Sequence, residues 1–234
     1  MIQRLVLILA AISVLGCTTV PVSTESRPDA YYSSVDLADP GGSLFSGDAA
    51  VLSDEAINTI LTYEYSPPQL SRIALMPFGR EAWSSWSEEL SLATDEMKDG
   101  VIDKLKASPR VYDASYLPSI LIPEKRTVPH LREAAARYQA DLMIVYRSYC
   151  RSFDRYRVFA ADKSRSFCGI EAILLDTRTG LVPFTSIASR TFDVVENDAD
   201  TNFQETRLKA QLTATSQALA DVSTEIVNFL ARSD

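Results

Sequence analysis

The chain has 234 residues, of which 46% are apolar and 9% aromatic, and its formal net charge is −8. This composition excludes a collagen-like repeat and a wholly disordered acidic chain, and its length allows one medium-sized domain or two small ones. The acidic balance argues against a nucleic-acid-binding protein, because such a protein needs a basic surface to displace the counterions of phosphates. Three cysteines and one histidine leave little material for a metal site, and we expect neither a metal nor another cofactor.

The first seventeen residues have the pattern of a secretory signal. Arg4 precedes an apolar run over residues 5–15, which is long enough for the core of a signal peptide and too short to span a bilayer. The run ends in Val14-Leu15-Gly16-Cys17, which resembles the lipobox of bacterial lipoproteins. The resemblance implies cleavage between Gly16 and Cys17, a diacylglycerol thioether on Cys17 and acylation of the new amino terminus. The alternative is an ordinary secretory signal with an incidental cysteine.

Acylation of Cys17 would make the lipid bilayer the first partner of this chain. Two or more acyl chains anchor persistently, since each buried methylene contributes about 0.8 kcal/mol. The residue after Cys17 is Thr18 rather than aspartate, which by resemblance to the sorting rule of two-membrane bacteria favours the outer membrane, with the body facing the periplasm. The mature chain would carry a charge of −9, so the lipid rather than electrostatic attraction to anionic headgroups would hold it.

Composition divides the chain into three parts. Residues 1–16 are the expected signal peptide. Residues 18–47 contain fifteen Ser, Thr, Pro and Gly in thirty positions, so 17–47 are expected to be the lipidated cysteine and a flexible tether. Residues 48–234 are expected to form a single α/β domain.

Helical and extended patterns alternate between residues 53 and 146. Ser53 has the position of an N-cap, and apolar residues spaced by three or four, ended by Pro109, indicate a helix over 86–107. Thr127 is the expected N-cap of the next helix, and residues 142–146 are apolar on both faces, as in a central strand. The expected elements are a helix from 53, a strand over 72–78, a helix over 86–107, a strand over 111–116, a helix from 127 and a strand over 142–146.

The remainder of the chain predicts antiparallel strands and one long helix. Strands are expected over 142–152 and 167–176, followed by a tight turn from Asp176 to Gly180 and a returning strand over 181–194. Apolar residues over 203–231 repeat at spacings of four and three, which suits either a coiled-coil seam between two copies or a helix laid on the sheet. Thr215 interrupts the seam and favours the sheet. The expected fold class is α/β (α+β): a mixed sheet with the order β-α-β-α-β, then antiparallel hairpins and a long C-terminal helix.

Cys150 and Cys168 are the two cysteines left in the body, and an exported protein is expected to join them as a disulfide. If they face each other across antiparallel strands, Tyr146 pairs with Ala172 and Ile144 with Leu174. These residues share one side of each strand with the cysteines, so a single assumption yields one continuous apolar face. A redox or metal-binding thiol pair is the alternative, but C-x-x-C spacing and histidine partners are absent.

Sequence motifs for catalysis are lacking. The chain has no G-x-S-x-G, S-x-x-K, P-loop, H-E-x-x-H or glycine-rich dinucleotide motif. His130 stands alone beside Pro129, and a hydrolase would have to assemble it with a remote serine and acid. Glu171 and Asp176 would lie on opposite faces of a regular strand, which disfavours a paired-carboxylate site. We therefore expect a protein that is not an enzyme.

One cationic segment stands out in this acidic chain. Six Lys and Arg fall within residues 147–165, interleaved with aromatic residues. On a regular strand, one face would carry Arg147, Tyr149, Arg151, Phe153 and Arg155, with Arg157 just beyond. Such a face could bind an acidic protein, a glycan carboxylate or a lipid phosphate. The alternative is a solvated hairpin whose arginines pair with Asp154 and Asp162. Trp83 is a second candidate contact residue.

The order of elements resembles that of several small bacterial outer-membrane lipoproteins. The residues that carry the resemblance are Ile73-Ala-Leu-Met-Pro-Phe78, Ala140-Asp-Leu-Met-Ile-Val-Tyr146 and Asp176-Thr-Arg-Thr-Gly180. The families are the curli-secretion-type lipoproteins, the penicillin-binding-protein-activator lipoproteins and the N-terminal domain of the Tol-associated periplasmic protein; lipoproteins associated with rhombosortase-type proteases are more loosely similar. The resemblance implies the α/β fold but no catalytic residues, and the long pore-forming insertions of the curli-type exporter are absent.

Three functions remain open at this point. The leading hypothesis is a non-enzymatic cell-envelope lipoprotein that docks onto a periplasmic or outer-membrane protein through residues 147–165. The second is an accessory subunit of an export or surface-polymer assembly, which would form a homo-oligomer through the helix over 203–231. The third is an envelope hydrolase.

Overall fold

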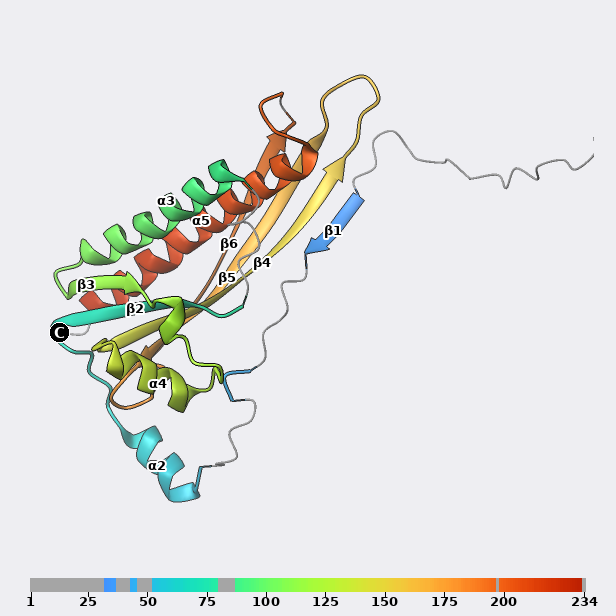
Figure 1. The fold of residues 1–234 in the computed structure, drawn as a ribbon. Helices are drawn as coiled ribbons and strands as arrows, with labels where there is room; N and C mark the ends of the chain where they lie inside the picture. Colours follow the sequence, from blue (N-terminus) through green and yellow to red (C-terminus); the bar gives the residue numbers. More distant parts are fainter. Residues whose placement is uncertain (1–31, 37–42, 46–51, 80–86, 197, 233–234) are drawn as a thin grey trace, which may run out of the picture.

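The computed structural model describes residues 32–36, 43–45, 52–79, 87–196 and 198–232. A mixed sheet runs in the order β3-β2-β4-β5-β6, and β1 pairs with part of β4 (Figure 1). This is the α/β fold class predicted from the sequence. The elements are β1 (Tyr32–Asp36), α2 (Asp54–Thr62), β2 (Ser71–Pro77), α3 (Glu88–Lys106), β3 (Val111–Tyr116), the 3-10 helix η1 (Ser119–Leu121), α4 (Val128–Arg137), β4 (Leu142–Arg155), β5 (Lys163–Asp176), β6 (Phe184–Val195) and α5 (Phe203–Ala231).

The first half of the sheet is parallel. Strand β2 lies between β3 and the beginning of β4 and is parallel to both. Its residues from Ile73 to Met76 are fully buried. A strand that is covered on both faces has no polar side to present, which is why this segment reads as an uninterrupted apolar run.

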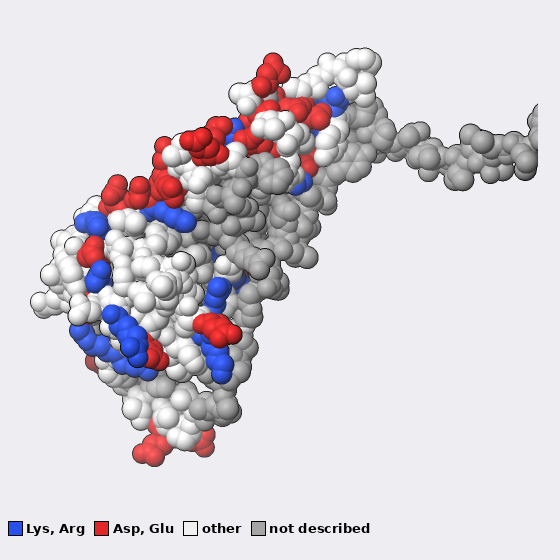
Figure 2. Space-filling view, viewed as in Figure 1, with Lys and Arg blue, Asp and Glu red and all other residues white. Residues whose placement is uncertain are grey.

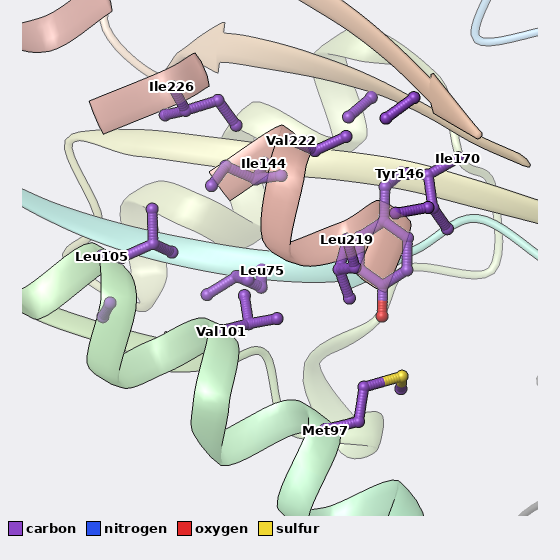
Figure 3. Packing of buried hydrophobic residues seen from close by; sticks show 14 of the residues in the cluster. Leu75, Met97, Val101, Leu105, Ile144, Tyr146, Ile170, Leu219, Val222 and Ile226 are labelled. Carbon is purple, nitrogen blue, oxygen red and sulfur yellow. The ribbon is translucent and has the colours of Figure 1, made fainter. Parts of the chain in front are cut away.

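Helices cover the sheet on both faces. Helices α3 and α5 lie side by side on one face, and the short α4 lies on the other (Figure 1). The larger apolar cluster lies between the sheet and the α3–α5 layer, where Leu75, Ile144 and Ile170 meet Val101 and Leu219 (Figure 3). The smaller cluster joins α4 to the opposite face of β2, β4 and β5. Among the described residues, no helix has the length and apolar character needed to cross a bilayer.

Helix α5 packs against the sheet within the chain, as the second of the two interpretations predicted. The apolar positions that suggested a coiled-coil seam are buried within the chain, including Leu212, Leu219 and Ile226. Thr215, which interrupts the seam, lies under the disulfide, with its Oγ1 3.6 Å from Cys150 Sγ. The same apolar spacing can pack a helix on a sheet or on a second helix, and in this chain these residues contact the sheet.

The β4–β5 hairpin has the register that the cysteine pair predicted. Cys150 and Cys168 are opposite each other and joined by a disulfide, and the same ladder pairs Tyr146 with Ala172 and Ile144 with Leu174. The turn after β5 also has the predicted chemistry. Gly180 adopts a φ of +76°, and the Asp176 carboxylate accepts a hydrogen bond from the Thr179 N–H at 2.7 Å.

Part of the segment expected to be a flexible tether belongs to the sheet. Strand β1 pairs antiparallel with residues 150–154 of β4. Strand β2 reaches β4 only at residues 142–146, so the outer half of that edge of β4 is free to accept another strand. Ser, Thr, Pro and Gly content does not reveal this pairing, because backbone groups form it.

Two details of the helices differ from expectation. Helix α2 forms where the Ser53 cap predicts it, but its apolar residues Ile57 and Leu61 are exposed and none of its residues is buried. Thr127 takes the N-cap position of α4, yet its side chain makes no capping hydrogen bond to the helix backbone. Its Oγ1 lies 2.7 Å from Nδ1 of His130 instead.

Candidate functional site

The outer half of the β4–β6 sheet turns one face away from α3 and α5. Alternate residues of β4 are exposed from Arg147 to Arg151 and half-buried at Phe153 and Arg155, while the residues between them point toward α5. The predicted cationic and aromatic strand face therefore exists, and the strand register extends it across β5 and β6. We call it the open face; it comprises Arg147, Tyr149, Arg151, Phe153, Arg155, Lys163, Arg165, Phe167, Gly169, Glu171, Ile187, Ser189, Thr191 and Asp193.

Cations outnumber carboxylates on the open face by five to two. Arg147 pairs with Glu171 across β4 and β5 at 2.5 Å, and Arg165 pairs with Asp193 across β5 and β6 at 2.6 Å. The hydrogen bond from Arg165 lowers the pKa of Asp193 below its usual range. Arg151 lies between these two pairs, opposite Phe167, and makes no ion pair with any residue in the described ranges. Its guanidinium is exposed and can bind an acidic partner without first breaking an ion pair.

Tyr149 lies flat across β5 because Gly169 leaves room for it. A Cβ atom at Gly169 would lie 2.3 Å from Cζ of Tyr149, which is too close for two non-bonded carbon atoms. The tyrosine ring thus occupies the space a side chain on the neighbouring strand would have used. It adds an apolar surface, 39% exposed, between the Arg147–Glu171 pair and Arg151. Spacing within β4 predicted the position of Tyr149 but not its glycine partner.

The remaining residues of the predicted site fall elsewhere. Arg157 lies in the turn after β4. Its guanidinium donates to the carbonyl of Ala161, and its backbone N–H donates to the Asp162 carboxylate at 2.7 Å. These contacts close the hairpin tip and take Arg157 away from the open face. Trp83, Gly16 and Cys17 lie outside the described residues.

A polar layer lies behind the outer half of the hairpin, on the side of α5. The hydroxyl groups of Ser152 and Ser166 are 2.9 Å apart, and Gln211 Nε2 donates to Ser152 Oγ at 3.0 Å. Nearer the tip, the buried Asp154 carboxylate accepts from Ser164 Oγ at 2.7 Å and lies 3.4 Å from Arg207. Hydrogen bonds offset the cost of burying polar groups, and this network joins the hairpin to α5. Asp154 is therefore not a partner for the arginines of the open face.

The helical side of the molecule has the opposite charge. Acidic side chains gather along the α3 and α5 layer in Figure 2. The exposed residues of α3 include Glu88, Glu89, Glu96 and Asp99. Lys209 of α5 is partly buried beside Asp200 and Glu89; burial disfavours its charged form, but the two hydrogen bonds outweigh burial and raise its pKa. An acidic partner would be repelled by this side and attracted to the open face.

The described residues contain no cluster of three His, Cys, Asp or Glu that could hold a metal ion. The hydroxyl of Thr127 lies within hydrogen-bonding distance of His130 Nδ1, and Arg147 donates a hydrogen bond to Glu171. The arrangement supports binding through exposed charge and aromatic surface.

The chain matches no protein-family model and no curated protein. Similar solved structures include hypothetical protein CT253 from Chlamydia trachomatis, with 10% identity over 69% of this chain and 98% of that chain at a TM-score of 0.41. PelC from Paraburkholderia phytofirmans, solved as a dodecamer, has 12% identity over 68% and 94% at 0.35. Lipoprotein GNA1162 from Neisseria meningitidis has 13% identity over 69% and 99% at 0.31. At these TM-scores the likeness identifies neither a family nor an activity.

Proposed function

We propose that this chain is a non-enzymatic lipoprotein of the bacterial cell envelope. Acylated Cys17 anchors it in the outer membrane, and its body faces the periplasm. The sequence Val14-Leu15-Gly16-Cys17 after an apolar run supports the anchor, and the Cys150–Cys168 disulfide is in keeping with an oxidising compartment outside the cytoplasm. Two or more acyl chains would hold the protein on one surface, where a binding face is useful only toward neighbours in the envelope.

The open face is the docking surface in this proposal, and its partner is an acidic region of another envelope protein. The observation that supports this proposal is the exposed Arg151, which shares a strand face with Tyr149 and lies opposite Phe167 of β5. The helical side of the protein, in contrast, is acidic. Aromatic residues and arginine supply much of the binding free energy at protein interfaces. The guanidinium can bind a carboxylate through two hydrogen bonds, which gives direction as well as attraction.

Charge reversal tests the docking. Cells producing the protein with Arg151→Glu are crosslinked and the protein is recovered, in parallel with wild type and with Lys104→Glu. Lys104 is an exposed lysine on α3, so the control has the same change in charge on the opposite side of the sheet. We expect Arg151→Glu to lose at least nine-tenths of the crosslinked partner and Lys104→Glu to retain it. Equal recovery from both variants would reject the open face as the docking surface.

Metabolic labelling tests the anchor separately. Cells grown with radioactive palmitate should label the wild-type protein and leave Cys17→Ala unlabelled, because the thioether and the new amino terminus both depend on Cys17. The labelled protein should fractionate with the outer membrane. Equal labelling of the two proteins would rule out lipidation at this residue.

A further inference from the structure

A hollow of about 430 Å³ lies at the inner end of the open face. Its floor is formed by β4, β5 and β6, and its wall by Phe78 and by Leu44 of the segment before α2. Val145 and Ile173 line its inner part, and Ile187, one of the most exposed apolar residues of the sheet, stands at its edge. The volume is within the range of about 300–1,000 Å³ that is typical of small-molecule sites.

The walls of the hollow suit an apolar ligand. Most lining side chains are apolar, and of the three serine and threonine side chains, Ser43, Thr185 and Ser186, the last already donates to Glu225 at 2.6 Å. A sugar or nucleotide would need more hydrogen-bonding groups than these to replace its water, and each group left unpaired costs several kcal/mol. A hydrocarbon chain has no hydrogen bonds to lose, and its methylenes that contact the walls would be removed from water.

Two arginines lie at or beside the mouth of the hollow. Arg147 lines it and pairs with Glu171, so the charges of these two lining residues balance. Arg126 is not a lining residue, but its guanidinium packs over the Phe78 wall, with 5.9 Å between Cζ and the ring centroid, and forms no ion pair with the residues described here. Arg126 can therefore add a positive charge beside the mouth. A ligand with an apolar body and one negative charge would match both parts of the site.

We propose that this hollow binds a single aliphatic chain that ends in an anionic head group, with the chain against Ile173 and Phe78 and the head at Arg147 and Arg126. The sheet floor and the apolar walls cover one side of the aliphatic chain, and the head group keeps access to solvent. The hollow shares Arg147, Glu171 and Ile187 with the open face, but the protein docking proposed above depends on Arg151, which lies further along β4 and outside the hollow. Either proposal can fail without the other.

The test is isothermal titration calorimetry of the full chain, exported with Cys17→Ala so that its own lipid is absent. Octanoate and decanoate are the anionic probes, and octanol is the neutral one. Affinity should rise about fourfold for each added methylene, and octanoate should bind at least threefold more tightly than octanol. Arg147→Gln should reduce the affinity for octanoate and leave that for octanol unchanged.

Two tryptophan variants locate the binding. Thr185 lines the hollow, whereas Thr191 is an exposed threonine on the same strand and face but outside it. Thr185→Trp should fill the hollow and weaken decanoate binding at least tenfold, and Thr191→Trp should bind like wild type. The proposal is overturned if wild type binds none of the probes, or if Thr185→Trp binds decanoate as wild type does. It is also overturned if octanol binds as tightly as octanoate.

Discussion

At the scale of single residues, a missing side chain on β5 decides how the open face is arranged. Gly169 has no Cβ, and Tyr149 of β4 takes the vacant space. Glycine within a strand ordinarily weakens it, because it gives up more conformational freedom than other residues and offers no side chain for packing. Here the aromatic ring from the neighbouring strand restores the packing.

A double-mutant cycle measures this contact. We expect Gly169→Ala to lower the free energy of unfolding by about 0.5 kcal/mol in the presence of Tyr149, because its methyl group displaces the ring, and to raise it by about 0.5 kcal/mol in a Tyr149→Ala background, because alanine is the better strand residue. The coupling of about 1 kcal/mol is read from urea unfolding of the four proteins. If the two single changes simply add, the ring does not depend on the glycine.

At the scale of elements, the N-terminus of α5 shows how one helix end is secured. Asn202 is the N-cap and accepts a hydrogen bond from the Glu205 N–H at 3.1 Å. The Glu205 carboxylate in turn accepts one from the Thr201 N–H at 2.9 Å. The Glu205 N–H also lies 3.0 Å from the Asn202 carbonyl oxygen, and Thr201 precedes the cap, so these hydrogen bonds join the incoming chain to the first turn of the helix. The hydrogen bond from Thr201 lowers the pKa of Glu205 below its ordinary value.

This reciprocal cap should make stability depend on pH. Since the pKa of Glu205 is lower in the folded chain than in the unfolded chain, its contribution is complete above the unfolded value of about 4.3 and is lost as pH falls through the folded pKa. Glu205→Gln removes that dependence. We expect the free energy of unfolding to fall less between pH 5 and pH 3 in the variant than in wild type, as followed by urea denaturation. Equal slopes would contradict the role of the carboxylate.

At the scale of the whole molecule, the disulfide lies where the apolar core gives way to the polar layer. On its inner side, Tyr146 and Ile170 belong to the large apolar cluster. On its outer side, the strands meet α5 through Ser152, Ser166 and Gln211. Apolar contacts are fewer in that outer half, so a covalent link there compensates for a thinner core.

Removing the crosslink should therefore destabilise the fold without changing its register. The cysteines are 18 residues apart, and a closed loop of that length contributes about 3 kcal/mol in the chain-entropy account. We expect the double variant Cys150→Ala/Cys168→Ala to lose about 3 kcal/mol of unfolding free energy and to keep the wild-type far-ultraviolet circular dichroism. Hydrogen exchange should increase first in the hairpin beyond residue 150. An unchanged denaturation midpoint would show that the crosslink adds no stability.

Local patterns in the sequence determined the helices and strands from α2 to α5, their order and the hairpin register, but not β1 or the 3-10 helix η1. Helix caps such as Ser53, apolar spacing along α3, and the turn from Asp176 to Gly180 act over a few residues, so they can be read without knowing the fold. The cysteine pair extended this to a long-range register, because residues two apart on a strand share one face. The cationic and aromatic face of β4 was predicted on the same basis.

Only the tertiary structure decided that this face is exposed and which side chains contact one another on it. Helix α4 is too short to cover the outer half of the sheet, so the face stays open; β2 ends early along β4, so β1 finds an edge to pair with. The contact of Tyr149 with Gly169, the diversion of Arg157 into the hairpin turn and the hollow beside Phe78 each join residues from different elements. Such contacts depend on where elements end relative to one another, a long-range property that no periodicity within a single segment records.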